Sequence, residues 1–244
     1  MATLALRWPQ GRSISHGRSN CDGCGRALTA RDLIPILSFV VLRGRCRTCG
    51  ATIARTHILI EFTAAVIGAV AFLIAPNIGG AACALLGWQL LLLGWLDARH
   101  WWLPHALSAL LAASGLTLGG VAMAAIGLEI TLVDRCIGMA GGFTALAIIA
   151  LGYRALRGRE GLGGGDAPML GAIGAWVGWA ALPLIMLLAA LVGIAIALIT
   201  LMRRSQDKDG LPIGQMRLPL GTLMAMATPF ALLLMYIIVL VPKP

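Results

Sequence analysis

Long apolar segments, separated by short polar ones, constrain the fold of this chain more than any other feature. Most of them reach the ~20 residues that a helix needs to cross the hydrocarbon core of a bilayer. Only 12% of the residues are charged, whereas soluble domains carry about a quarter. The sequence therefore predicts an all-α polytopic membrane protein with about seven transmembrane helices. We expect the short fifth run to begin inside protein or beside a water-filled cleft. The apolar runs span residues 58–75, 80–96, 103–127, 134–153, 166–180, 182–202 and 218–241.

Basic residues predict the orientation of these spans. Residues 1–57 form the one substantial polar segment and hold nine of the 19 basic residues. If this segment lies in the cytosol and the spans alternate, 17 basic residues fall on the cytosolic side and two, Arg135 and Lys243, on the other. Since cytosolic loops carry the excess of Lys and Arg, we expect a multi-pass protein of the bacterial inner membrane with its N-terminal segment inside. The chain then divides into a cytosolic segment, 1–57, and a transmembrane domain, 58–244.

The net charge of +9 follows from this topology and does not require a nucleic-acid partner. No basic face with interleaved aromatic residues is present, so we expect the lipid bilayer, and not nucleic acid, as a partner. Tryptophans near span ends are expected to anchor in the membrane interface. They are Trp101, Trp102, Trp176 and Trp179.

Two acidic residues lie at the edges of predicted spans. Asp97 ends the second span in GWLDARHWWLP, and Asp166 begins the fifth in GLGGGDAPMLGAIGAW. In the predicted topology both lie at the same depth, on the cytosolic side of the membrane. An ionisable residue within or at the edge of a span is costly and is a functional candidate by default. We therefore predict that Asp97 and Asp166 form one site, although they are far apart in sequence.

A pair of adjacent carboxyl groups has the chemistry of an aspartyl protease. The two groups cannot both ionise comfortably, so the pair shares one proton. The ionised member can then activate a water molecule while the protonated member polarises the scissile carbonyl. Gly163, Gly164 and Gly165 lack side chains, so their backbone can approach an extended substrate closely and adopt unusual dihedral angles. The sequence thus predicts an intramembrane aspartyl endopeptidase.

Other roles for these residues stay open on the sequence alone. Asp97 can pair with Arg99, and Asp166 can cap the fifth helix. The glycine run can cradle phosphate at a helix N-terminus, although no lysine follows it as in a phosphate-binding loop. A proton-coupled transporter also uses membrane carboxylates, but near the bilayer midplane. A zinc-ribbon membrane scaffold without catalysis is the remaining class, and it would tolerate the loss of either aspartate.

Four of the six cysteines form two CxxC pairs in the polar N-terminal segment. Cys21 and Cys24 are separated from Cys46 and Cys49 by 21 residues, slightly more than the ~15–20 that are usual in zinc ribbons. Two such pairs supply four thiolates to a tetrahedral metal ion. Because CxxC pairs in a reducing compartment indicate a metal site, we predict structural zinc in a cytosolic zinc-ribbon-like loop. Disulfides or free thiols are the alternatives.

At these residues the sequence resembles the bacterial type IV prepilin peptidases, a family of GxGD aspartyl proteases. The resemblance covers nearly the whole chain, from about Cys21 to the last span. A lone GxGD motif has little specificity, whereas five blocks in the family's order are specific. The blocks are CDGCGRALTARDLIPILSFVVLRGRCRTCG, IEF at 60–62, LDARHWWLP, GLGGGDAPML and LPIGQMRLPLGTLMAMA.

The resemblance implies a prepilin peptidase with Asp97 and Asp166 as its catalytic pair and the four cysteines as its loop tetrad. Members of the family cleave the basic leader of type IV prepilins, or of type II secretion pseudopilins, after a glycine at the cytosolic face. Many then N-methylate the new N-terminus with S-adenosylmethionine. The family's usual first span, with its GSFLN-like motif, has no match here, and this departure bears on the methylation. Two further departures are Pro168, where the family has lysine, and His105, where an acidic residue is common.

Overall fold

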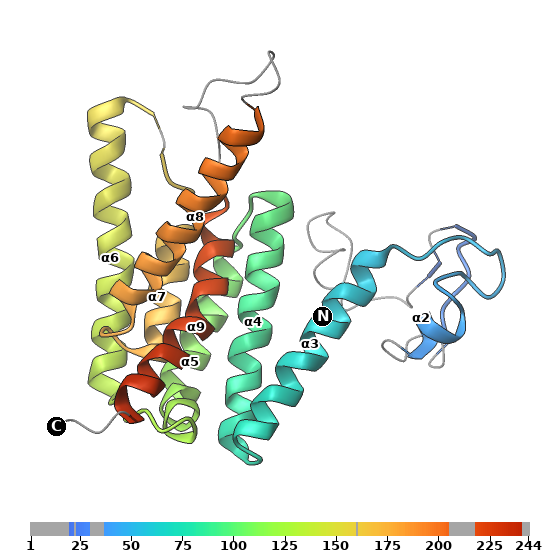
Figure 1. Ribbon diagram of the computed structural model, residues 1–244, viewed down its shortest axis with the longest axis horizontal. Coiled ribbons are helices and arrows are strands. Elements are labelled where there is room, and N and C mark those ends of the chain that lie inside the picture. The colour runs from blue at the N-terminus through green and yellow to red at the C-terminus, as the bar shows by residue number, and fades with distance from the viewer. Residues whose placement is uncertain (1–19, 22, 30–36, 160, 205–217, 241–244) are drawn as a thin grey trace. The chain divides into compact units, whose positions relative to one another are not determined.

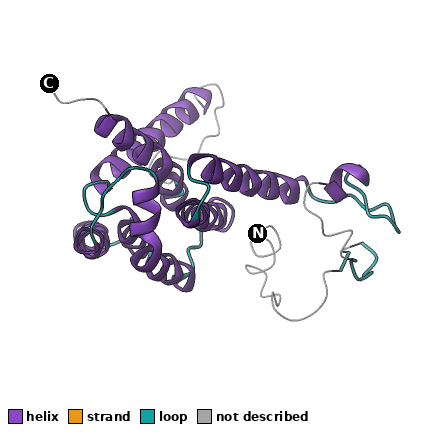
Figure 2. Cartoon of the chain, turned by 90° about the horizontal axis from the view of Figure 1, so that it is seen from below, coloured by secondary structure: helices purple, strands orange, loops and turns teal. Residues whose placement is uncertain are grey.

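The structure is a computed structural model that describes residues 20–21, 23–29, 37–159, 161–204 and 218–240. The chain forms two compact units, residues 1–70 and 71–244. Within the described residues both consist of helices and connecting loops (Figure 2), with two isolated antiparallel bridges near the N-terminus. Residues 211–217, the first part of the closing sequence block, lie outside the described residues.

Helices account for most of the described chain (Figure 1). Six of those described are long and apolar enough to cross a membrane. The prediction of an all-α polytopic membrane protein is therefore confirmed, and the expected fifth span is a seventh, shorter helix, α7. The helices are α2 (Leu37–Val41), α3 (Arg55–Ile74), α4 (Ile78–His100), α5 (His105–Ala125), α6 (Leu132–Arg157), α7 (Asp166–Val177), α8 (Leu182–Arg204) and α9 (Leu220–Leu240).

α7 is enclosed by other helices of the second unit. Its 12 residues rise only ~18 Å, well short of the ~30 Å hydrocarbon core. Every residue from Met169 to Val177 is buried, and α5, α6, α8 and α9 all contact this helix. A helix that is apolar on all sides belongs in the interior of a protein. The expectation that the fifth run begins inside protein is confirmed.

Glycines allow α6 and α7 to approach each other closely. A Cβ atom at Gly138 would lie 2.7 Å from the carbonyl oxygen of Gly174, and a Cβ atom at Gly174 would in turn overlap the backbone of Gly138. Small residues of this kind are typical of helix interfaces in membranes. The close crossing fixes α7, and with it Asp166, against a full-length helix.

Trp176 differs from the sequence prediction. It was expected to anchor at the membrane interface, but it is 0% exposed, and its Nε1 donates a hydrogen bond to the carbonyl of Leu111 at 2.8 Å. The reason is the enclosed position of α7, which keeps this side chain away from the bundle surface. Trp179, just beyond α7, is 52% exposed.

The helix α4 extends past the expected end of its span. It continues to His100 and ends at Trp101, whose φ of 53° is left-handed and whose N–H bonds the carbonyl of Asp97. α5 then begins at His105, directly after Pro104. Asp97 therefore lies within the last turn of a helix, where its backbone is fixed.

The crossing of α6 and α7 predicts unequal effects of two substitutions on α6. Gly138→Ala should lower the thermal unfolding temperature in detergent, because the added methyl group meets backbone atoms at 2.7–2.8 Å and such overpacking costs about 1–3 kcal/mol. Gly141→Ala is the matched control, since a Cβ atom there has nothing within 4 Å. It should be neutral or stabilising by up to about 1 kcal/mol. A Gly138→Ala protein as stable as the wild type would contradict this packing.

Candidate active site

Asp97 is buried in the last turn of α4 and is held by the first turn of α9. Asp97 is only 6% exposed. The backbone N–H of Thr222 donates to Asp97 Oδ2 at 2.7 Å, and the Thr222 hydroxyl lies 3.1 Å from the same oxygen. The N–H groups in the first turn of a helix lack partners within that helix. The carboxyl group of Asp97 therefore provides a hydrogen-bond acceptor for the first turn of α9.

Asp166 is the first residue of α7 and is buried as deeply as Asp97. The residue is 5% exposed, and its Oδ2 accepts a hydrogen bond from the backbone N–H of Gly163 at 3.0 Å. The backbone N–H of Asp166 in turn bonds the carbonyl of Gly163 at 3.1 Å. These two bonds close the glycine-rich loop onto the start of α7.

The two aspartates lie at the same end of the helix bundle. α4 ends there and α7 begins there (Figure 1), and the charge of Asp97 acts on the carboxyl group of Asp166. Among the described residues they are the only buried carboxyl groups. The fold thus brings together two acidic side chains from distant parts of the chain, in surroundings that penalise charge.

Leu103, in the connection between α4 and α5, packs between the segments that hold the two aspartates. A Cβ atom at Gly165 would overlap the Cβ of Leu103, and one at Gly221 would lie 2.8 Å from Leu103 Cδ1 and 3.0 Å from Asp97 Oδ2. Glycine is therefore needed at both positions so that these segments can meet.

The glycines before α7 are required for close packing. They do not adopt unusual backbone angles. None of the residues 163–165 has a positive φ, and Gly165 has φ −89° and ψ −13°, which any residue can adopt. The expectation of unusual dihedral angles is therefore wrong. Gly164 differs from its neighbours, because a Cβ atom there would have nothing within 4 Å.

The described contacts do not support two alternative roles of the aspartates. Arg99, considered as a partner of Asp97, lies over the ring of Trp95 at 5.3 Å from its centroid. The N-cap of α7 is Gly165, without a side-chain cap hydrogen bond. Asp166, considered as that cap, instead bonds back to the loop that precedes it.

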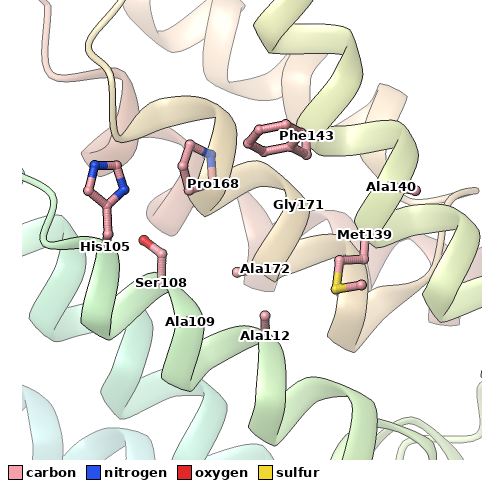
Figure 3. Close-up of a pocket in the computed structure, with 10 residues that line it drawn as sticks. All are labelled: His105, Ser108, Ala109, Ala112, Met139, Ala140, Phe143, Pro168, Gly171 and Ala172. Atoms are coloured by element: carbon pink, nitrogen blue, oxygen red, sulfur yellow. The ribbon is translucent and has the colours of Figure 1, made fainter.

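A recess of about 340 Å³ lies between α5, α6 and α7 (Figure 3). Its lining is mostly small and apolar, with Ala112 from α5, Phe143 from α6 and Pro168 from α7 among its residues. Ser108 also lines it and is 2% exposed. Pro168 follows Asp166 by two residues, which is about 200° around a helix. The recess is therefore on a different face of α7 from Asp166.

The four N-terminal cysteines gather into one cluster in the first unit. The sulfur atoms of Cys21, Cys24, Cys46 and Cys49 all lie within 4.8 Å of one another, and those of Cys21 and Cys49 are 3.8 Å apart. Four thiolates around one metal ion at the zinc–sulfur distance of ~2.3 Å are ~3.8 Å from each other. The donor set and its dimensions therefore fit a metal ion.

Two equivalent turns hold these cysteines. In the first, the N–H of Gly25 bonds the carbonyl of Cys21 at 2.9 Å, and in the second, the N–H of Gly50 bonds the carbonyl of Cys46 at 3.0 Å. Gly25 and Gly50 have φ of 68° and 70°, a left-handed conformation that glycine adopts without strain. Each CxxC pair thus presents both of its thiols on one side of a tight turn.

The thiols of the cluster do not titrate alike. Hydrogen bonds from the backbone N–H groups of Cys49 and Thr48 lower the pKa of Cys46 to about 6. The backbone N–H of Ala51 acts in the same direction on Cys49, but bonding to the thiol of Cys24 and partial desolvation outweigh it and raise the pKa of Cys49 to about 11. One thiol is therefore readily available as a thiolate, the form that binds metal.

Sequence reasoning assigned no role to Thr222, Gly221 or Leu103. The closing block contains LPLGT, which marks the start of the last span. Thr222 and Asp97 are 125 residues apart, and no local pattern indicates that this helix start lies against that aspartate. Only the packing of α4 against α9 reveals the contact.

Comparisons with known proteins agree with the resemblance seen in the sequence. The model of the bacterial peptidase A24 N-terminal domain matches residues 1–75, and the model of the type IV leader peptidase family matches residues 84–198. A prepilin leader peptidase/N-methyltransferase of Aeromonas hydrophila is 38% identical over 219 residues, which cover 88% of this chain and 71% of the relative. A protein of the same name from Burkholderia pseudomallei is 37% identical over 222 residues, with 89% and 70% covered.

A third relative with this name, from Pseudomonas aeruginosa, is 35% identical over 216 residues, which cover 88% of this chain and 71% of the relative. No solved structure matches the chain significantly. The two family models follow each other along the sequence, as the cysteine loop and the membrane helices do. On this evidence the chain belongs to the type IV leader peptidase family and is an enzyme of the bacterial inner membrane.

Proposed function

We propose that this protein is an aspartyl endopeptidase that removes the basic leader of type IV prepilins, or of type II secretion pseudopilins. The observation that carries the proposal is the pair of buried, interacting carboxyl groups of Asp97 and Asp166 at one end of an apolar helix bundle. Membership of the leader peptidase family supports peptide hydrolysis. The names of the relatives support a prepilin as the substrate.

The pair can hydrolyse a peptide bond by general acid–base catalysis. The ionised carboxylate removes a proton from water while the water oxygen attacks the scissile carbonyl carbon. The protonated carboxyl gives its proton to the carbonyl oxygen, which yields a tetrahedral diol. The first carboxyl then passes its new proton to the amide nitrogen as the C–N bond breaks. The second takes a proton back from one diol hydroxyl as the carbonyl forms again, and the pair regains its single shared proton.

The glycine-rich loop is the proposed contact with the substrate backbone. The N–H of Gly163 is already bonded to Asp166, and Gly165 is packed against Leu103. Gly164 is exposed and has open space where a side chain would be. We therefore assign substrate contact to residues 163–165, with Gly164 as the one that has open space at its Cβ position.

The cytosolic face is the proposed side of cleavage. Arg99 lies in the last turn of α4, and Arg154 and Arg157 lie in the last turn of α6, at the end of the bundle that carries the carboxyl pair. An excess of basic residues favours the cytosolic side. A substrate with a basic leader is attracted to the anionic cytosolic leaflet, which brings its scissile bond to the depth of the two aspartates.

The other two functional classes fit the geometry less well. A proton-coupled transporter holds its carboxylates near the midplane in interrupted helices, whereas Asp97 is in the last turn of α4 and Asp166 in the first turn of α7. A scaffold without catalysis has no need for two buried carboxyl groups, whose burial is costly. Hydrolysis is the function that uses them both.

Replacement of either aspartate by asparagine should abolish leader cleavage. Asp97→Asn and Asp166→Asn each remove a group that must gain and lose a proton, so we expect the cleavage rate to fall by about 10²–10⁴-fold. The measurement is cleavage of a prepilin by purified protein in detergent. Glu129→Gln, which changes an exposed carboxyl group outside the pair, is the control and should cleave at the wild-type rate. A wild-type protein that leaves the leader intact, or either asparagine variant with full activity, would refute the proposal.

We further propose that the cysteine cluster binds structural zinc and that residues 1–57 form a cytosolic segment before the transmembrane peptidase domain, 58–244. The distances among the four sulfur atoms support zinc, and four cysteine ligands leave no open position for chemistry. When bound, the ion would hold the two tight turns together. The catalytic steps require only the aspartates.

Metal analysis of the purified, reduced protein should find about one zinc ion per chain. Cys24→Ser removes one of the four ligands and should lower the zinc content well below one, because three thiolates bind the ion less tightly. Cys136→Ser is the matched control, since Cys136 is an exposed thiol outside the cluster. A zinc content near zero in the wild type, or an unchanged content in Cys24→Ser, would disprove the site.

We also propose that the protein N-methylates the new N-terminus, with S-adenosylmethionine as methyl donor. The proposal rests on the names of the relatives, which include N-methyltransferase. The recess between α5, α6 and α7 does not fit this donor, because its lining offers no carboxylate for the positive sulfonium group.

Mass spectrometry of the mature substrate, after cleavage in the presence of isotope-labelled S-adenosylmethionine, should show one added labelled methyl group. Asp166→Asn provides unprocessed substrate as the reference, because its leader should remain attached. A fully cleaved but unmethylated product would mean that this chain has the peptidase activity alone.

A further inference from the structure

We propose that Thr222 is a positioning residue for the catalytic pair, and that it holds Asp97 Oδ2 at the start of α9 in both protonation states of Asp97. The inference rests on the proposed peptidase function, in which Asp97 must exchange a proton during each cycle. Thr222 does not need to touch the substrate. Its role is to keep one oxygen of Asp97 fixed while the proton on that carboxyl group changes.

Thr222 contacts Asp97 through two separate groups. Its backbone N–H donates to Oδ2 at 2.7 Å, a short distance that is typical of hydrogen bonds to a charged acceptor. Its hydroxyl oxygen lies 3.1 Å from Oδ2 and 2.9 Å from the carbonyl oxygen of Gly94. Gly94 precedes Asp97 by three residues on α4, so both acceptors belong to the same helix.

The hydroxyl group has one hydrogen and two acceptors within reach. When Asp97 is ionised, the hydroxyl donates to Oδ2. When Oδ2 carries a proton, that proton is donated to the hydroxyl oxygen, and the hydroxyl hydrogen turns to the carbonyl of Gly94. A hydroxyl can do both because it is a donor and an acceptor. No heavy atom has to move between the two states, so Asp97 keeps its position through the cycle.

The first turn of α9 provides the fixed frame for this contact. Its N–H groups are unpaired within the helix, and a helix N-terminus favours a negative charge. A Cβ atom at Gly94 would lie 3.1 Å from Ala225 Cβ, so α4 and α9 cross closely at this point. Both hydrogen bonds from Thr222 to the carboxyl group of Asp97 fall on Oδ2.

Three substitutions test the hydroxyl group by itself. Thr222→Val keeps the shape and the backbone N–H but removes the hydroxyl, and Thr222→Ser restores it. Thr228→Val is the matched control, because Thr228 is a buried threonine on the same helix whose hydroxyl donates to the carbonyl of Met224 at 2.8 Å. The measurements are kcat and KM for cleavage of a prepilin, together with thermal stability in detergent.

Thr222→Val should lower kcat by about 10- to 100-fold, the usual effect of losing a hydrogen bond to a charged group. KM should stay within about twofold, because the hydroxyl acts on Asp97 and not on the bound substrate. Thr222→Ser should recover most of the activity, and Thr228→Val should have wild-type kcat. Gly221→Ala perturbs the same carboxyl group by a different means, because its methyl group would lie 3.0 Å from Asp97 Oδ2. It should also lower kcat.

Wild-type kcat in Thr222→Val would overturn the inference. So would a loss of activity that Thr222→Ser does not recover and that follows a loss of thermal stability, because the role would then be structural. These outcomes are distinct from failure of the peptidase proposal. If Asp97→Asn still cleaves, the function itself is wrong, whereas an inactive Asp97→Asn with a fully active Thr222→Val removes only the role of Thr222.

Discussion

The burial of two carboxyl groups at one end of the helix bundle sets the requirements for the rest of this structure. A buried charge is stable only when it is hydrogen-bonded or neutralised. The start of α9 supplies donors to Asp97, and the loop before α7 supplies one to Asp166. In the proposed mechanism, a shared proton removes the remaining repulsion. The ends of α4, α7 and α9 must therefore meet at one place, and Gly165 and Gly221 leave the space that this meeting needs.

The short length of α7 is a consequence of the same requirement. A helix that crossed the whole bilayer would carry Asp166 to the membrane surface. α7 has only 12 residues, and it begins inside a ring of longer helices, where Asp166 is 5% exposed. Gly138 and Gly174 let α6 pack closely along it, so a helix too short to span the membrane is still held firmly.

The sequence predicted those features that depend on local patterns. Apolar length identified the helices, the cost of a charge in a span identified Asp97 and Asp166, and the CxxC spacing identified the cysteines that gather into one cluster. The features it missed depend on which helices are neighbours. Trp176 looked like an interfacial anchor, but it is buried because α7 is enclosed. Thr222 carried no signal of its own, because its partner Asp97 lies 125 residues earlier. Leu103 packs against two glycines that only the fold brings together.

Binding of a non-cleavable substrate analogue tests the central claim most directly, which is that both carboxyl groups act on one reacting carbon. Such an analogue carries a hydroxyl group in place of the scissile carbonyl and imitates the tetrahedral intermediate, which an enzyme binds more tightly than its substrate. The account predicts one bound analogue per chain and much weaker binding in both Asp97→Asn and Asp166→Asn. Unchanged affinity in either variant would contradict it, because the hydroxyl group would then face only one of the two aspartates.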